Sequence, residues 1–149
     1  MRNKIITNLK SLDCDKNSHL LLAVSGGIDS MVMLHFFQQN KKQFKFSVAH
    51  INHNYHSESK KMENLVKAEC VNKNNLIIRN IDANEINSNI ESEFRKIRYN
   101  ELERIREDVN ADFIVTAHHA DDQAETVMMK ILNSSGFDGS QGIRNKNHN

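Results

Sequence analysis

The sequence predicts an α/β domain built on a doubly wound parallel sheet. Short, wholly apolar runs alternate with longer amphipathic segments, and this alternation repeats four times along the chain. The length of 149 residues suits one domain, and a hydrophobic share of 38% can fill its core. Because strands and helices alternate along the chain, we expect parallel strands joined by right-handed crossovers. A doubly wound sheet usually has roughly five or six strands, so we expect this chain to be a fragment truncated after its fourth strand–helix unit.

Each predicted element has its own pattern. Residues 20–24 form a continuous apolar run, which is typical of a strand covered on both faces. The segment 29–40 is apolar nearly all round, whereas the later segments repeat apolar residues at spacings of three and four, as amphipathic helices do. The predicted strands are 20–24, 44–51, 76–81 and 113–116, and the predicted helices are 29–40, 62–70, 94–109 and 120–132.

Charge and cysteine content narrow the class of protein. The 20 Lys and Arg residues nearly balance the 19 Asp and Glu residues, so an RNA substrate would need a local basic patch or another domain to hold it. Cys14 and Cys70 form no CxxC pair, which argues against a disulfide framework or a zinc knuckle and fits a reducing cytosol. No apolar run is long enough for a signal peptide or a membrane span. We therefore expect a cytoplasmic protein without membrane contact, with Cys70 packed in the core and Cys14 incidental.

Six residues between the first predicted strand and helix, Ser25 to Ser30, read Ser-Gly-Gly-Ile-Asp-Ser. The strand would deliver them to the carboxyl edge of the sheet, where open α/β folds bind ligands. Paired glycines let backbone N–H groups converge on an anion, and the helix start adds further donors. Asp29 can cap the helix or bind a Mg²⁺ that bridges to phosphates. The segment predicts a phosphate loop, with a plain capped turn as the alternative; the GxxxxGK[ST] of P-loop NTPases and the Rossmann GxGxxG are both absent.

This hexapeptide resembles the SGGxDS signature of the PP-loop, or N-type ATP pyrophosphatase, superfamily. Members of that superfamily have an adenine nucleotide alpha-hydrolase-like fold, cleave ATP between its α and β phosphates and adenylate a carbonyl-type oxygen. The signature is specific for the superfamily but does not identify the substrate. The resemblance implies that ATP binds at Ser25, Gly26, Gly27, Ile28, Asp29 and Ser30.

A second motif, residues 116–126, leads from the fourth predicted strand into the last predicted helix. Asp121 and Asp122 fall in the first turn of that helix, where the dipole favours carboxylates, and Glu125 shares a face with Asp122. Ordinary acidic capping is the alternative. If the first and fourth strands are neighbours, this turn stands beside the phosphate loop. Residues 118–126 resemble the HHxDDQxET segment of tRNA(Ile)-lysidine synthases.

Three further segments carry the same resemblance, which covers nearly the whole chain. Residues 49–53 resemble the VxHxNH segment that lies near the nucleotide in that family. Residues 91–99 resemble its ExxARxxRY helix, with Phe94 in the usual alanine position. Residues 135–143 resemble its glycine-rich GSGxxGLxGM stretch, with substitutions.

Two departures from the family pattern each delete an arginine that could touch phosphate or RNA. Tyr55-His56 stands where the family commonly has Leu-Arg, and Asn133-Ser134 stands where it commonly has Arg-Gly. The phosphate loop and the acidic helix are intact. The departures therefore affect residues expected to bind the phosphates or the RNA substrate.

The resemblance implies an ATP-dependent ligase that joins L-lysine to C2 of the wobble cytidine of a tRNA(Ile) with a CAU anticodon. The base would be adenylated first, so that AMP and pyrophosphate are released. We expect residues 1–149 to form the catalytic domain, with the tRNA-binding region outside this chain and a homodimer left open. One alternative is a PP-loop tRNA sulfurtransferase, which would need the paired cysteines that this chain lacks. The other is a non-catalytic ATP-binding module.

The implied site draws residues from several segments. Asp29 and Asp122 would hold Mg²⁺, while Asp122 and Glu125 would orient the lysine and take up its proton. Arg95 and Arg98 share a helical face, where they could meet pyrophosphate or form surface ion pairs instead. A zinc site of histidines is disfavoured, because no cysteine accompanies them. The residues implied as catalytic are Asp29, Arg95, Asp122 and Glu125, and those implied for nucleotide binding beyond the hexapeptide are His50, Asn52 and His118.

Overall fold

The computed structural model describes residues 14, 17–54, 57–81, 90–119 and 127–133. Five strands form one sheet in the order β3-β2-β1-β4-β5. The first four strands run parallel, and β5 is antiparallel to β4. The strands are β1 (His19–Ala23), β2 (Lys45–Asn52), β3 (Leu76–Asn80), β4 (Phe113–His119) and β5 (Val127–Asn133). The helices are α2 (Ile28–Gln39), α3 (Ser59–Glu69) and α4 (Ile90–Asp108), with a 3-10 turn η1 (Lys73–Asn75).

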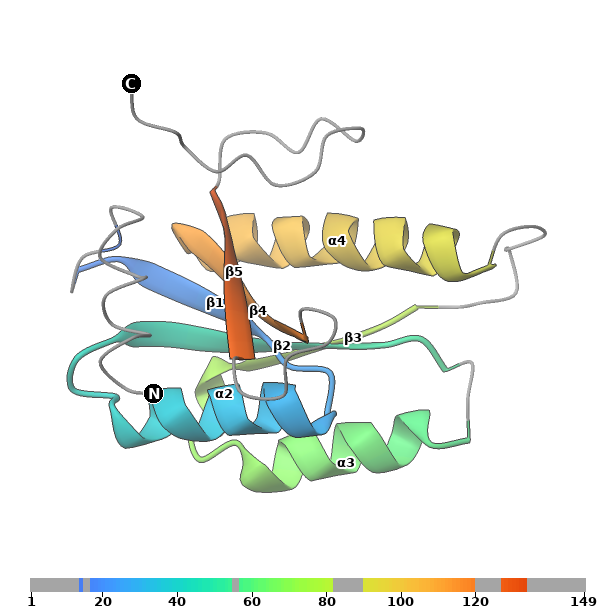
Figure 1. The fold of residues 1–149 in the computed structure, drawn as a ribbon, viewed down its shortest axis with the longest axis horizontal. Coiled ribbons are helices and arrows are strands. Elements are labelled where there is room, and N and C mark those ends of the chain that lie inside the picture. Colours follow the sequence, from blue (N-terminus) through green and yellow to red (C-terminus); the bar gives the residue numbers. More distant parts are fainter. Residues whose placement is uncertain (1–13, 15–16, 55–56, 82–89, 120–126, 134–149) are drawn as a thin grey trace.

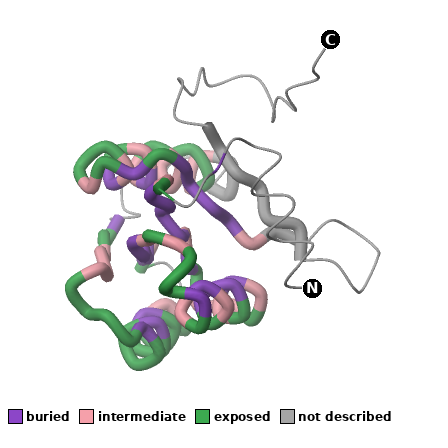
Figure 2. The backbone as a smooth tube through the Cα atoms, turned by 90° about the vertical axis from the view of Figure 1, so that its left-hand side faces the viewer, coloured by how far each residue is buried: buried purple, intermediate pink, exposed green. Residues whose placement is uncertain are grey.

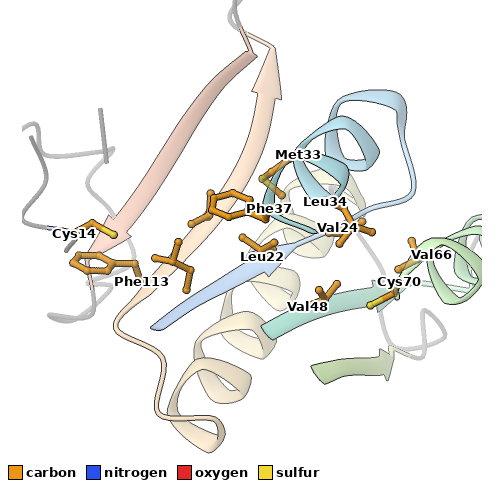
Figure 3. Packing of buried hydrophobic residues seen from close by; sticks show 12 residues of the cluster. Cys14, Leu22, Val24, Met33, Leu34, Phe37, Val48, Val66, Cys70 and Phe113 are labelled. Atoms are coloured by element: carbon orange, nitrogen blue, oxygen red, sulfur yellow. The ribbon is translucent and has the colours of Figure 1, made fainter. Parts of the chain in front are cut away.

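The helices divide between the two faces of the sheet. α2 and α3 lie on one face and α4 lies on the other, which gives three layers (Figure 1). Successive strand residues point to opposite faces, so Leu20 and Leu22 pack with residues of α2 and α3, while Leu21 packs with residues of α4. Figure 2 shows buried residues along the strands and recurring along the helices. The first core cluster comprises Cys14, Leu20, Leu22, Val24, Met33, Leu34, Phe37, Val48, Val66, Cys70, Phe113 and Val115 (Figure 3).

β1 lies at the centre of the sheet. The chain first runs outward from β1 to β2 and β3, and then returns through α4 to β4 on the other side of β1. In open α/β sheets a ligand crevice forms outside the carboxyl end of the strands where this reversal occurs. The fold therefore places the loop after β1 at the position where ligands bind.

The four predicted parallel strands and the first three predicted helices are confirmed, with shifts of a few residues at their ends. The assumption that the first and fourth strands are neighbours is also confirmed, because Ala23 pairs with Thr116. No helix in the part of the chain that the structure describes is long and apolar enough to cross a membrane.

The predicted helix 120–132 is wrong over its second half, because Val127–Asn133 is strand β5. Its apolar residues are nearly contiguous, and a short run of this kind fits a strand as well as a helix face. As a strand, the segment bonds along the edge of β4 from Phe113 to His119 and covers hydrogen-bonding groups that would otherwise be exposed. Residues 120–126 lie outside the described residues.

Both cysteines are buried in the core, but the sequence predicted this for Cys70 alone. Cys70 is 2% exposed and packs in the first core cluster, as expected. Cys14 was expected to be incidental, and this is wrong: it is 5% exposed and belongs to the same cluster as Phe113 (Figure 3). A small apolar thiol fits such a position, although its sequence neighbours show no apolar pattern that would reveal it.

Candidate nucleotide site

The loop between β1 and α2 is tightly constrained at Gly26. Its φ of +91° lies in the region that glycine alone adopts without strain. A Cβ at Gly26 would also lie 2.8 Å from the Cβ of Met62, at the start of α3. The first of the two predicted glycines is therefore required both by the backbone and by the neighbouring helix.

Two serine hydroxyls hold the backbone of this loop. The Gly26 N–H donates to Ser30 Oγ at 3.1 Å, and the Ser30 hydroxyl donates to the Gly27 carbonyl at 2.8 Å. The Gly27 N–H donates to Ser25 Oγ over a longer, exposed contact of 3.3 Å. A phosphate oxygen is a stronger acceptor than a hydroxyl, so it can replace Ser25 Oγ at the exposed Gly27 amide. The loop is thus preformed and offers its outermost donor to an anion.

The start of α2 adds to this anion site. Gly27 is the N-cap, with extended backbone and no side-chain cap, and the first helical bond runs from the Met31 N–H to the Gly27 carbonyl at 3.0 Å. The amides of the first turn precede that bond and point toward the loop, where the helix dipole favours negative charge. Ile28 is 83% exposed, and because its side chain has no hydrogen-bonding atom it can offer a phosphate its backbone N–H alone. Asp29 lies half-buried in the same first turn.

His50 lies beside the loop, at the carboxyl end of β2. Its side chain is buried, and its Nδ1–H donates to the carbonyl of Val24, one residue before the loop, at 2.8 Å. Desolvation by burial lowers the pKa of His50, so the ring is neutral at neutral pH and its Nε2 is an acceptor. Within the described residues Nε2 is buried and has no hydrogen-bond partner. A buried acceptor next to a phosphate loop suits a donor group of a nucleotide.

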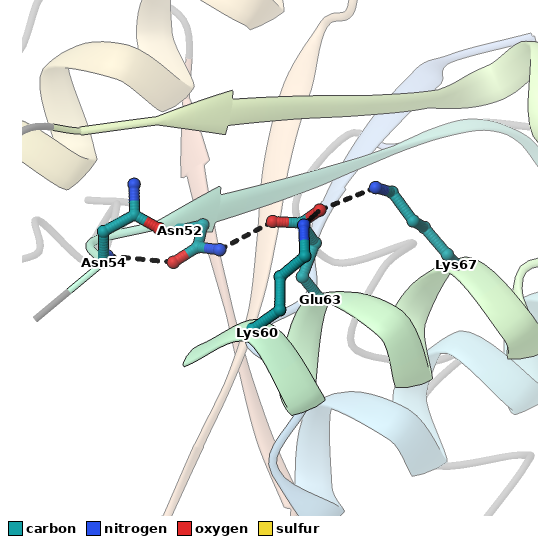
Figure 4. Close-up of polar contacts among 5 residues, drawn as sticks. All are labelled: Asn52, Asn54, Lys60, Glu63 and Lys67. Carbon is teal, nitrogen blue, oxygen red and sulfur yellow. Dashed lines mark hydrogen bonds and ion pairs between the residues drawn. The ribbon is translucent and has the colours of Figure 1, made fainter. Parts of the chain in front are cut away.

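Asn52 is bonded to the protein on both sides of its amide. Its Nδ2 donates to Glu63 Oε2 at 2.6 Å, and its Oδ1 accepts from the Asn54 N–H at 2.9 Å (Figure 4). Asn54 has a φ of +50°, so the bond from Asn52 supports a left-handed residue in the turn after β2. The structure therefore places Asn52 at the site edge as a support for that turn; its predicted contact with the nucleotide stays a prediction.

Glu63 is a feature of this edge that the sequence analysis missed. Its side chain is 4% exposed, and Oε1 accepts from Lys60 at 2.9 Å and from Lys67 at 2.6 Å (Figure 4). Hydrogen bonds from Lys67, Asn52 and Lys60 lower the pKa of Glu63 to about 2. The signal was present: Glu63 precedes Val66 by three residues and Cys70 by seven, so it lies on the apolar face of its helix.

The first half of α4 lies beside the end of β2. The ring of Phe94 contacts that of His53 edge-to-face at 5.0 Å between centroids. Burial lowers the pKa of His53, and the nearby charge of Arg98 lowers it further. Arg95 and Arg98 place their guanidinium carbons 5.9 and 5.6 Å from the centre of the Tyr99 ring. Arg95 is exposed there, and its predicted contact with ATP phosphates stays a prediction.

Of the acidic motif, residues 116–126, the structure places only residues 116–119 at the carboxyl edge of the sheet. The pairing of β1 with β4 carries the β4 backbone past the end of β1, so that His118 and His119 follow at the carboxyl side. Asp121, Asp122 and Glu125 lie outside the described residues. No group of three His, Cys, Asp or Glu side chains suited to a metal ion occurs among the residues that the structure places.

Comparison with solved structures agrees with this fold. The U34-tRNA thiolase NcsA from Methanococcus maripaludis, solved with its [4Fe-4S] cluster, matches with a TM-score of 0.56 over 68% of this chain and 39% of its own. Sequence identity is 19%, so this likeness concerns the fold alone.

Curated relatives are more similar in sequence. The tRNA(Ile)-lysidine synthase of Clostridium acetobutylicum is 37% identical over 97% of this chain, and that of Thermosipho africanus is 34% identical over 91%. The Listeria monocytogenes bifunctional protein TilS/HprT is 35% identical over 85%. This chain spans 33% of the length of the first two proteins and 21% of the third. The family model described as a PP-loop domain matches residues 1–149, so the chain belongs to the PP-loop domain family, and this membership implies that it binds ATP.

Proposed function

We propose that this chain is the ATP-binding, catalytic part of a tRNA(Ile)-lysidine synthase. The observation that carries the proposal is the Ser25–Ser30 loop, held open to an anion at the carboxyl end of the central strand. The names of its curated relatives support the choice of substrate, as does the resemblance of residues 118–126 to the family's acidic segment.

ATP would bind with its phosphates over this loop. The amides of Gly27 and of the first α2 turn would donate to phosphate oxygens, and His50 Nε2 would accept from a donor on the nucleotide. Asp29, a carboxylate in the first turn of α2, would hold Mg²⁺ together with Asp122. The ion would supply positive charge that offsets the charge of the phosphates.

In the first step the C2 oxygen of the wobble cytidine would attack the α-phosphorus of ATP. A bond from O2 to the α-phosphorus forms, the bond from the α-phosphorus to the bridging oxygen breaks, and pyrophosphate leaves. The loop amides and Arg95 would stabilise the negative charge that grows on the phosphates. Preorganised donors of this kind contribute most when they are fixed before the reaction, as the serine bonds fix the loop here.

In the second step the ε-amine of L-lysine would attack C2 of the adenylated cytidine. A C2–N bond forms, the C2–O2 bond breaks, and AMP leaves with that oxygen. The amine must be neutral to attack, so the lysine ammonium has to lose a proton first. Asp122 and Glu125 would hold the ammonium and accept this proton.

A sulfur-transfer activity has less support. It would need exposed, paired cysteines, whereas Cys14 and Cys70 are 5% and 2% exposed in the hydrophobic core. Burial also raises the pKa of Cys70, which disfavours a thiolate there.

The proposal is tested with the purified chain and a tRNA(Ile) transcript with a CAU anticodon. We expect ATP binding in the presence of Mg²⁺, measured by calorimetry, and AMP release that rises on addition of L-lysine, although weakly because a tRNA-binding region is expected elsewhere in the protein. A methionine tRNA with the same CAU anticodon is the control for tRNA choice. A folded chain without ATP affinity would refute the proposal, and AMP release that depends on a sulfur donor would favour the alternative.

A further inference from the structure

Glu63 connects three elements at the ligand edge of the sheet. It belongs to α3, its Oε2 accepts from Asn52 at the end of β2, and its neighbour Met62 lies against Gly26 of the phosphate loop. The Asn52 carbonyl also accepts the N–H of Ile81, after β3, at 2.8 Å. A single carboxylate thus joins α3 to the strand ends, immediately beside the point where α3 touches the loop.

Burying the Glu63 carboxylate at this position costs desolvation free energy. Its side chain is 4% exposed, and a buried charge is tolerated only when it is fully bonded. Both oxygens are used, by Asn52 on one side and by Lys60 and Lys67 on the other (Figure 4). Val66 or Cys70, on the same helix face, show that an apolar residue can pack there. A residue that only filled space would not need three donors.

Gly26 has no side chain with which to hold its own position. Its virtual Cβ would lie 3.2 Å from both the Cα and the carbonyl oxygen of Met62, so the loop packs against the backbone of α3. If the first turn of α3 moved away, Gly26 would lose that support and the donors around Ser30 would lose their alignment. Glu63, the residue after Met62, bonds this part of α3 to the end of β2 through Asn52.

We propose that Glu63 is a positioning residue that clamps α3 against Gly26 and so keeps the phosphate loop in its binding geometry. This inference rests on the proposed function only for its ATP readout; the clamp itself is a property of the loop. The bond from Asn52 carries the restraint, and the two lysines balance the charge of the carboxylate. ATP affinity is thereby controlled from a residue that does not touch ATP.

The test measures amide hydrogen exchange of Gly26 and Gly27 by NMR in the full 149-residue chain. Glu63→Gln keeps the shape of the side chain but has only one acceptor oxygen, so it cannot accept from Asn52 and from the two lysines at once. We expect these two amides to exchange about tenfold faster. The double variant Asn52→Asp with Glu63→Gln swaps the carboxylate and the amide at constant length, so it restores the bond with its direction reversed. We expect it to return the exchange to within about twofold of the wild-type rates.

Ile105→Val is the matched control. Ile105 is buried in the second core cluster, on the α4 side, so this variant lowers overall stability without touching the clamp. We expect exchange at Gly26 and Gly27 to stay unchanged in it. If Glu63→Gln does not fold, Lys67→Met, which removes one of the two balancing charges, should give a smaller increase of about threefold.

The clamp would be overturned if Gly26 and Gly27 exchanged at the wild-type rate in folded Glu63→Gln, or in Lys67→Met where that variant replaces it. It would also be overturned if these amides exchanged as fast in the double variant as in Glu63→Gln alone. ATP affinity gives the second readout: we expect about a tenfold weaker Kd in Glu63→Gln and no change in Ile105→Val. If the wild-type chain did not bind ATP, the proposed function would be refuted, but the exchange rates would still test the clamp.

Discussion

Gly26 of the phosphate loop is packed directly against Met62 of α3. The contact is made by backbone: a Cβ at Gly26 would lie 3.2 Å from the Met62 Cα and carbonyl oxygen, as well as 2.8 Å from its Cβ. Atoms of a helix backbone cannot rotate away as the end of a flexible side chain can. The loop and the third helix therefore form one unit, although more than thirty residues separate them in sequence.

Gly26→Ala should weaken both folding and ATP binding. The variant meets the Met62 backbone and must also place a Cβ on a residue with a φ of +91°. We expect a loss of about 1–3 kcal/mol in the free energy of unfolding, measured by urea titration, and an ATP Kd raised at least about tenfold.

Gly27→Ala is the comparison for that prediction. Gly27 has a φ of −73°, and among the residues that the structure describes its virtual Cβ meets Ser25 Oγ alone, at an ordinary 3.5 Å. We expect its free energy of unfolding to stay within about 1 kcal/mol of the wild-type value. Equal destabilisation by the two alanines would show that the contact with Met62 does not constrain the loop.

Glu63 should make stability depend on pH in the acid range. Its pKa is about 2 in the folded chain against an ordinary 4.5, so its contribution is complete above pH 4.5 and is lost as the pH falls toward 2. Because Lys60 and Lys67 are 69% and 48% exposed, solvent screens their charges, and we expect the contribution to be on the order of 1 kcal/mol.

The measurement compares the wild-type chain with Glu63→Gln by urea unfolding across that range. The difference in free energy of unfolding between them should be constant above pH 4.5 and should shrink steadily below it. A difference that does not change down to pH 2 would contradict the ionised, bonded carboxylate.

The sequence was sufficient for the centre of the fold. β1 and the loop after it were predictable because a continuous apolar run meets paired glycines at a helix start, and each of these patterns is local. The segment 127–133 was not, since its nearly contiguous apolar residues suit either a helix face or a strand. The choice between them came from pairing with β4, which is a contact between distant residues.

The candidate site was predictable to a similar degree. His50 lies beside the hexapeptide, because the hexapeptide follows β1 and His50 lies near the carboxyl end of β2, the parallel strand paired with β1. The contact of Asn52 with the nucleotide stays a prediction. The bonds of its amide to Glu63 and Asn54 could not be predicted, because a sequence does not show which of its polar residues bond to each other. Glu63 was missed because a glutamate within a helix that also carries exposed lysines reads as surface.

His50→Asn should weaken ATP binding while preserving the loop. The asparagine Nδ2 can still donate to the Val24 carbonyl in place of His50 Nδ1, but the buried acceptor at Nε2 is lost. We expect an ATP Kd raised about tenfold, which is the effect of one hydrogen bond to the ligand. His35→Asn, on the exposed side of α2, is the control and should leave the Kd unchanged. Equal affinity in wild type and His50→Asn would exclude His50 from the site.

His50 should also make the folded chain less stable at mildly acid pH. Burial lowers its pKa below 6.5, so the unfolded chain binds the proton more readily and stability falls as the pH drops from 6.5 toward the folded pKa. The pKa values of His19 and His53 are lowered for the same leading reason and act in the same direction. In His50→Asn we expect a shallower fall across this range, measured by thermal unfolding, but not its disappearance. An identical pH profile in both proteins would show that His50 does not resist protonation.

Asp29 gives the sharpest test of the metal. If its carboxylate holds a Mg²⁺ that also contacts the phosphates, removal of Mg²⁺ with EDTA should weaken ATP binding strongly in the wild type and only slightly in Asp29→Asn. Without the metal, the variant should bind ATP as well as the wild type or better, because a carboxylate in the first turn of α2 repels phosphate. The two changes should therefore be non-additive, with a coupling of about 1–3 kcal/mol in a cycle of Mg²⁺ and Asp29 measured by calorimetry. Additive losses would mean that Asp29 acts on the start of α2 and not on the metal.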